Sequence, residues 1–189
     1  NEYYLLFKSE VKHIDFQKLK NKQYCALAFQ LNEKNEIVKA NTSNLFVFFE
    51  TGYDTYLNFL IQAPFITTPA RDNIKTDNPL NIQLIEEVNQ LIINTIRFFA
   101  SEKLITMGLL EQLPMENSAN EKGKVLYKKI FETVKSELLS DGQYIPTITP
   151  GLIKPVNEVA IVRGRELISI LSSIEDLEEL FGKKYWVNT

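Results

Sequence analysis

Apolar and polar side chains alternate in the first part of the chain, and this pattern predicts β-strands. Residues 3–11 are predicted to form one strand. Residues 24–31 place apolar side chains at every second position, so that one face of a second strand can be buried. The positions on that face are Cys25, Leu27, Phe29 and Leu31. Residues 32–35 predict a turn, after which residues 36–40 can pair back as the second arm of a hairpin.

Two further strands are predicted from apolar runs. Residues 45–49 read LFVFF, a short, continuously apolar run of the kind expected for a strand that is covered on both faces. The sequence Glu-Thr-Gly at residues 50–52 is predicted to end it. Residues 56–63 form another strand candidate, which ends before Pro64 because proline cannot donate a backbone hydrogen bond.

A long helix is predicted after residue 78. Asn78 suits the N-cap and Pro79 suits the first helical position, where the missing N–H is not needed. Apolar side chains then recur at spacings of three and four, which predicts one buried stripe against a sheet. The stripe consists of Leu84, Ile85, Val88, Leu91, Ile92, Ile96 and Phe99. A shorter helix is expected over residues 104–113, before Pro114.

The polar residues 116–124 predict a boundary between two regions. The first, residues 1–115, is an α+β domain, and the second, residues 121–189, is smaller and mostly helical or extended. In the second region Leu126, Ile130, Val134 and Leu138 are spaced for another amphipathic helix. Its proline-rich residues 141–155 favour short strands or extended loops. Residues 165–171 and 173–181 predict two short helices, and Trp186 is expected to be an apolar anchor.

Composition narrows the class of protein. Of the 189 residues, 44% are hydrophobic and 24% are charged, which is typical of a globular protein. The net charge of −3 and the lack of a basic stripe give no signal for nucleic acid. No apolar run approaches the roughly 20 residues that span a bilayer. Because the chain begins with Asn1 and not with methionine, we interpret it as part of a longer protein.

Candidate chemistry is sparse. The single cysteine, Cys25, is expected to be a buried apolar residue, and the single histidine, His13, has no partners nearby for a zinc site or a catalytic triad. Phosphate-binding glycine motifs and hydrolase motifs are missing. One loop, residues 67–77, carries Arg71, whose planar guanidinium suits a phosphate. Two interpretations stay open for it: a local ion pair with Asp72 or Asp77, or a site that awaits an anion.

A family resemblance bears on this loop. Residues 45–74, LFVFFETGYDTYLNFLIQAPFITTPARDNI, together with the capped apolar helix after them, resemble bacterial Hsp90-like ATPases of the GHKL superfamily that carry a sacsin N-terminal-type ATP-binding domain. Residues 144–171 resemble a downstream region of the same family. The sequence departs from the family at Glu50, where proline is usual, and at Asp72, where glutamate is usual. More distantly, residues 55–74 and the helix resemble the Hsp90 middle domain.

The resemblance implies a fold. It is an α+β fold with a mixed β-sheet flanked by helices, like the Hsp90 middle domain and ribosomal S5 domain 2, followed by a smaller and mostly helical region. The matched residues resemble the segment after the ATP-binding domain and do not include that domain's nucleotide pocket. ATP and Mg²⁺ would therefore be bound by an absent upstream domain, with neither a cofactor nor a metal site in these residues.

The resemblance also implies a function. The segment would dock on its own upstream ATP-binding domain, and Arg71 would act as a catalytic residue by reaching the γ-phosphate of ATP. Thr67, Thr68 and Asn73 are expected to contact the nucleotide beside it. Docking would couple ATP hydrolysis to conformational change, and the whole protein would be a cytoplasmic, chaperone-like ATPase. Its further partner would be a client protein or a second copy of itself in a homodimer. The alternative is a non-enzymatic interaction or dimerisation module, which uses exposed apolar side chains in residues 3–7 and around Trp186.

Overall fold

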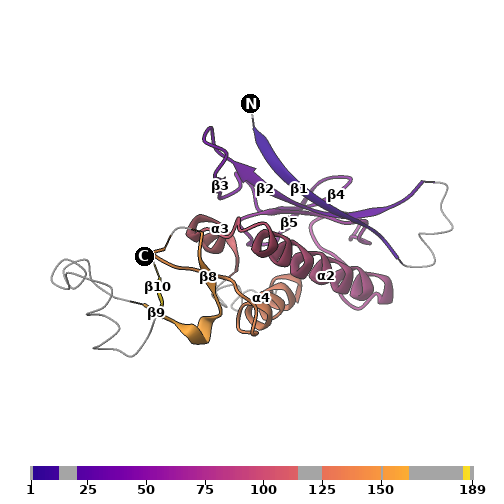
Figure 1. Ribbon diagram of the computed structural model, residues 1–189. Coiled ribbons are helices and arrows are strands. Elements are labelled where there is room, and N and C mark those ends of the chain that lie inside the picture. Colours follow the sequence, from indigo (N-terminus) through magenta and orange to yellow (C-terminus); the bar gives the residue numbers. More distant parts are fainter. Residues whose placement is uncertain (1, 13–20, 115–124, 150, 162–184, 188–189) are drawn as a thin grey trace.

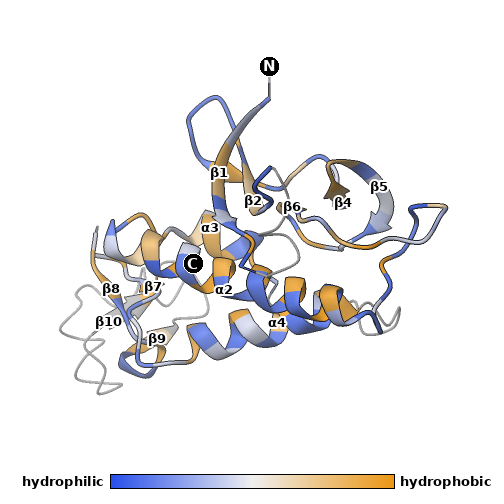
Figure 2. Ribbon diagram, turned by 90° about the vertical axis from the view of Figure 1, so that its right-hand side faces the viewer, coloured by the Kyte–Doolittle hydropathy of each residue, from blue (hydrophilic) through white to orange (hydrophobic). Residues whose placement is uncertain are grey.

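The computed structural model describes residues 2–12, 21–114, 125–149, 151–161 and 185–187. In these residues the protein has an α+β fold built on a six-stranded mixed sheet and three α-helices (Figure 1). The described helices lie together on one side of the sheet, and the opposite side carries none of them (Figures 1 and 2). The predicted fold class is therefore confirmed at the level of an α+β protein with a mixed sheet.

One half of the sheet consists of the first two predicted strands and the predicted second arm of the hairpin, strands β1, β2 and β3. Strand β1 (Tyr3–Glu10) pairs antiparallel with β2 (Tyr24–Leu31) along its whole length, from Tyr3 opposite Leu31 to Glu10 opposite Tyr24. Strand β3 (Ile37–Val38) pairs back on the end of β2. The turn before β3 contains Asn35 in the left-handed region, with φ 61°, a conformation that asparagine tolerates well. Both strand predictions and the turn are confirmed.

The other half mixes parallel and antiparallel pairing. Strand β6 (Leu60–Gln62) lies between β2 and β4 (Asn44–Val47), antiparallel to the first and parallel to the second. Strand β5 (Phe49–Asp54) closes the order β1-β2-β6-β4-β5. The strand predicted over residues 56–63 is shorter than expected, because it begins only at Leu60. Tyr56 has φ 58°, a left-handed conformation that excludes this residue from an extended strand.

The strand predicted over residues 45–49 is confirmed only as far as Val47. Strand β4 ends at Val47, the chain reverses at Phe48, and β5 begins at Phe49 and runs through the residues that were expected to end the strand. Leu45 and Val47 are buried, whereas the side chains of Phe48 and Phe49 are 63% and 78% exposed. The hydroxyl of Thr51 donates to the carbonyl of Leu45 at 2.7 Å and ties the two arms together. A tight hairpin, and not a doubly covered strand, accommodates this run.

Helix α2 (Pro79–Ser101) forms as predicted. The side chain of Asn78 accepts a hydrogen bond from the Leu80 N–H at 2.9 Å, and Pro79 takes the first helical position. All seven predicted stripe residues are buried. They face the buried side of β2. Four aromatic rings, from β1, β2, the residue before β6 and α2, contact one another there in edge-to-face or stacked geometry. These rings are Phe7, Phe29, Phe59 and Phe99.

The remaining helices extend the same core. Helix α3 (Met107–Gln112) covers part of the predicted residues 104–113, and its N-cap Thr106 accepts from the Leu109 N–H. Helix α4 (Val125–Leu138) packs beside α2, and its predicted stripe is buried in one core with the sheet. The predicted boundary at residues 116–124 lies outside the described residues and stays a prediction. No described helix is long and apolar enough to cross a membrane.

The end of the described chain is extended, as the prolines predicted. Strands β7 (Ile145–Pro146) and β8 (Ile153–Lys154) pair antiparallel. A 3-10 turn, η2 (Val156–Glu158), leads into β9 (Val159–Ile161), which pairs in parallel with β10 (Tyr185–Val187). Trp186 lies in β10. His13 and the helices predicted over residues 165–171 and 173–181 lie outside the described residues.

Candidate functional site

Arg71 lies where the sequence placed it, in the loop between β6 and α2. The loop closes on itself: Thr67 and Ile74 form an isolated antiparallel bridge. The Thr68 N–H donates to the carbonyl of Asn73 at 2.9 Å, and the Arg71 N–H donates to the carbonyl of Thr68 at 3.0 Å. Arg71 itself has φ 57°. A non-glycine residue in that region costs of the order of 1 kcal/mol and persists only where neighbours hold it in place.

The β4–β5 hairpin is the neighbour that holds Arg71. Its guanidinium Nη2 donates to the carbonyl of Val47 at 2.9 Å and to that of Phe49 at 3.4 Å. In return, the carbonyl of Arg71 accepts from the Gly52 N–H at 2.8 Å. This approach does not require glycine, because a Cβ at Gly52 would lie 3.4 Å from the Cα of Asp72, an ordinary van der Waals contact. Arg71 thus joins the loop to the hairpin tip on both sides of Phe48.

Among the described residues, Arg71 neither forms the predicted ion pair with Asp72 or Asp77 nor extends into solvent without a hydrogen-bond partner. The half-buried guanidinium is not isolated in solvent, because Nη2 binds two backbone carbonyls. It also makes no ion pair with Asp72 or Asp77 in the contacts of the described chain. Asp72 instead accepts a hydrogen bond from the hydroxyl of Thr68 at 2.6 Å. The result is a cation that is fixed by neutral carbonyls and not neutralised by a carboxylate.

The other predicted site residues lie in the same loop and serve its internal structure. The hydroxyl of Thr68 also lies 3.4 Å from the carbonyl of Asn73. The side chain of Asn73 accepts from the Ile74 N–H at 2.9 Å. Thr67 is half-buried at the bridge to Ile74. The loop therefore brings Arg71, Thr67, Thr68 and Asn73 together, and the prediction that they contact a nucleotide stays a prediction.

Asn81 anchors this loop and was missed by the sequence analysis. Its fully buried amide accepts from the Ile66 N–H and donates to the carbonyls of Ile66 and Lys75, all within 2.9 Å. A buried polar group must have such partners. The signal was present, because Asn81 precedes Leu84 by three residues and so continues the apolar stripe of α2. A polar residue at a stripe position indicates a specific buried hydrogen-bond role.

A second missed cluster joins α2, α4 and the segment after α4. Arg97 contacts the carboxylate of Glu137 through Nε at 2.8 Å and Nη2 at 3.0 Å, and the hydroxyl of Tyr144 donates to the same carboxylate. Burial alone would raise the pKa of Glu137, but the hydrogen bonds from Arg97 and Tyr144 outweigh it and hold the pKa below its ordinary value. Burial, then the bond to Glu137, raises the pKa of Tyr144. This geometry is that of a structural clamp.

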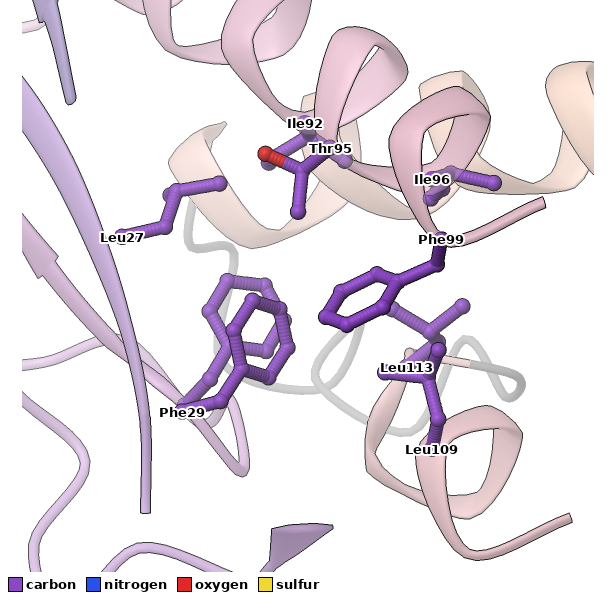
Figure 3. Close-up of a pocket in the computed structure, with 9 residues that line it drawn as sticks. Leu27, Phe29, Ile92, Thr95, Ile96, Phe99, Leu109 and Leu113 are labelled. Atoms are coloured by element: carbon purple, nitrogen blue, oxygen red, sulfur yellow. The ribbon is translucent and has the colours of Figure 1, made fainter. Parts of the chain in front are cut away.

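The cavity within the core has no room for a small substrate, whereas two larger hollows are open to the surface. The cavity drawn in Figure 3 is a gap of about 10 Å³ between α2, α3 and the aromatic cluster, which is at most the size of one water molecule. The only polar group shown lining it, Thr95, already donates to the carbonyl of Leu91. A polar groove of about 320 Å³ lies between α2 and α4 and includes Glu137. A shallow apolar hollow of about 180 Å³ lies over Ala26 and Ala28 on the uncovered face of the sheet.

Metal and thiol chemistry have no support in the described residues. Among them, no group of three or more His, Cys, Asp or Glu side chains is placed to hold a metal ion. Cys25 is buried, and burial raises the pKa of its thiol to about 12. Because the thiolate is the reactive form, this residue is a core side chain, as predicted. Arg71 remains the one predicted catalytic residue.

Comparison with protein-family models gave no match, and comparisons with curated protein sequences and with solved structures gave none either. No family is therefore shown for this chain, and the resemblance of residues 45–74 and 144–171 stays a prediction.

Proposed function

We propose that this chain is the middle segment of a larger cytoplasmic ATPase of the GHKL superfamily, with the finer fold of an Hsp90 middle domain. The segment docks on its upstream ATP-binding domain, where ATP and Mg²⁺ are bound, and supplies Arg71 to the γ-phosphate. One observation carries the proposal. Arg71 is half-exposed, is fixed by backbone carbonyls, and has no carboxylate partner in the described part of the chain.

The fixed geometry suits transition-state stabilisation. Both hydrogen bonds of the guanidinium use Nη2, so Nε and Nη1 keep donors for an incoming anion. Phosphoryl transfer spreads negative charge over the γ-phosphate oxygens, and a cation that is already positioned stabilises that charge without reorganising. Carbonyls hold the guanidinium in place without cancelling its charge, which a carboxylate would do.

Docking makes the reaction conditional on conformation. A cation on one domain can act on a nucleotide bound to another only when the two domains are docked. ATP hydrolysis therefore depends on docking. Asn81 and the Thr68–Asn73 hydrogen bonds keep the loop rigid. The same loop contains Thr67, Thr68 and Asn73. In this proposal these residues exchange their present hydrogen bonds within the loop for contacts with the phosphate.

The test is ATP hydrolysis by the intact parent protein. Arg71→Ala is expected to lower kcat by roughly a thousandfold, the size of effect measured for arginine fingers, with KM changed much less. Lys75→Ala is the matched control, because it removes a cation from an exposed position of the same loop. Arg71→Lys keeps the charge but loses the planar fork, and we expect it to recover only part of the rate. Unchanged kcat in Arg71→Ala would refute the proposal.

A second candidate function is a protein-interaction module without catalysis. The exposed pair Phe48 and Phe49 at the hairpin tip favours it, and Arg71 would then serve only to hold the tip in shape. In that case Arg71→Ala leaves ATP hydrolysis by the parent protein unchanged. The double variant Phe48→Ser, Phe49→Ser would instead abolish binding of the upstream domain, measured by calorimetry.

A further inference from the structure

The outer edge of β1 is an open strand edge. β1 is the last strand on its side of the sheet, is eight residues long and contains no proline. It pairs with β2 on one side only, and no described residue pairs with it on the other. Figures 1 and 2 show it at the end of the sheet. Unpaired N–H and C=O groups on such an edge are a template for another strand.

The ladder identifies the groups that face outward. The Val11 N–H donates to the carbonyl of Gln23 at 2.8 Å and continues the register in which Glu10 lies opposite Tyr24. Antiparallel pairs alternate between bonded and non-bonded positions. The odd-numbered residues of β1 therefore bond to β2. The even-numbered residues, from Tyr4 to Lys8, direct their N–H and C=O groups toward the open edge.

Exposed apolar side chains border this edge on both faces of the sheet. Leu6 is 59% exposed on the uncovered face, beside the hollow over Ala26 and Ala28. Tyr3 is 57% exposed and, by strand alternation, belongs to the same face of β1 as Phe7. There Phe98 of α2, 45% exposed, contacts Phe7 with ring centroids 5.6 Å apart. Monomeric proteins usually protect a long edge with charge, proline or a covering segment; β1 carries Lys8 and Glu10 but no proline, and no described segment covers its outer edge.

We propose that β1 pairs antiparallel with β1 of a second copy of this chain and joins two sheets into one. The register is fixed by side chains. Even residues must face even residues, and one register sets Glu2 opposite Lys8 of the second copy and Tyr4 opposite its Leu6. Two ion pairs then flank two apolar pairs across a two-fold axis, an arrangement that stabilises cross-strand pairing.

The neighbouring registers are less favourable. Shifting the second copy one way sets Glu2 opposite Glu10, which brings like charges together. Shifting it further sets Leu6 opposite Lys8 and Tyr4 opposite Glu10, which pairs apolar groups with charges. Opposed like charges destabilise antiparallel pairs. Charge complementarity between Glu2 and Lys8 is therefore the argument for a second copy at this edge, where the carboxylate of Glu2 would exchange its hydrogen bonds from Asn41 and Tyr4 for the ion pair. This argument is independent of the role proposed for Arg71.

The test is the oligomeric state of the chain by sedimentation velocity. The unmodified chain is expected to sediment as a dimer. Lys8→Glu and Glu2→Lys each turn both ion pairs into repulsive pairs, and each is expected to raise the dimer dissociation constant about tenfold or more. The double variant Glu2→Lys, Lys8→Glu restores the pairing. An equimolar mixture of the two single variants forms a heterodimer, in which every charge is matched.

Two controls keep the test decisive. Lys34→Glu makes the same charge change in the exposed turn between β2 and β3 and is expected to leave the dimer intact. Leu6→Lys places a charge at an exposed edge position without removing a core contact. It is expected to be a monomer by sedimentation velocity and to be folded by circular dichroism. A chain that stays monomeric at about 0.1 mM, a dimer that is insensitive to all three edge variants, or a double variant that is not rescued would overturn the proposal.

Discussion

Helix α2 and the β4–β5 hairpin both carry large apolar side chains, but α2 buries its apolar stripe, whereas the hairpin exposes two of the five residues of its apolar run. In α2 all seven stripe residues are buried. In the hairpin, Leu45 and Val47 enter the core while Phe48 and Phe49 stand in solvent. The difference follows from geometry, because helical spacing gathers side chains on one face, whereas a tight reversal after Val47 carries the next two beyond the edge of the core.

The comparison teaches that apolar character alone does not assign a residue to the core. An apolar residue stabilises the fold where neighbouring side chains surround it, and the stripe residues of α2 are surrounded in this way along the whole helix. At the hairpin tip, Arg71 donates to the backbone carbonyls of Val47 and Phe49, on either side of Phe48. Exposed apolar side chains held by a fixed backbone are typical of a surface that binds something, which is why this tip matters to both proposed functions.

The largest expected effect is a difference in the free energy of unfolding between substitutions in α2 and in the β4–β5 hairpin. Leu84→Ala removes a fully buried side chain from α2 and is expected to lower the free energy of unfolding by about 2–5 kcal/mol. Phe49→Ala removes a larger side chain, yet it is expected to change stability by no more than roughly 0.5 kcal/mol because that side chain is exposed. Urea denaturation of both variants measures this. Comparable losses would show that the hairpin tip packs on something.

A medium effect concerns Glu137, a charged residue on the buried face of α4. Because its folded pKa lies below the ordinary value, its stabilising contribution is present above that value and is lost as the pH falls through the folded pKa. Glu137→Gln is expected to cost about 1–2 kcal/mol at neutral pH and to flatten the acid side of the stability profile. Urea titrations from neutral to acid pH check this, with the exposed Glu132→Gln as the matched control, for which the profile should not change.

The smallest effect concerns the backbone at the hairpin tip. Phe48 has φ 62°, which costs an ordinary residue about 1 kcal/mol and glycine almost nothing. Phe48→Gly is therefore expected to raise the free energy of unfolding by about 0.5 kcal/mol, after the greater flexibility of unfolded glycine is subtracted. Phe49→Gly, within β5, is expected to lower it by about 0.5–1 kcal/mol. If thermal unfolding gave the two variants the same sign, backbone strain at Phe48 would be ruled out as the cause.

The elements that the sequence predicted are those with local signals. Strand β2 has strict alternation, and α2 has a cap at Asn78, a proline at its first position and a long stripe. The hairpin at Phe48 has no such signal, because phenylalanine rarely adopts a positive φ and no glycine or asparagine marks the turn. Asn81 was predictable in principle from its place in the stripe of α2, although its three partners were not.

The candidate site divides in the same way. The sequence located Arg71 in the loop before α2, together with Thr67, Thr68 and Asn73. It could not give the partners of the guanidinium, because the carbonyls of Val47 and Phe49 belong to a hairpin more than 20 residues earlier. Backbone carbonyls are present at every residue, so no amino-acid pattern identifies the ones that will be used.

By itself, the sequence determined the long strands β1 and β2, the capped helix α2 and the apolar faces that these elements bury, because alternation and helical spacing act between residues close together in the chain. Only the tertiary structure decided that Phe48 and Phe49 are exposed, that Arg71 binds carbonyls and that Glu137 pairs with Arg97, 40 residues before it. These outcomes depend on which distant segments meet, and that is set by how the sheet and helices pack together.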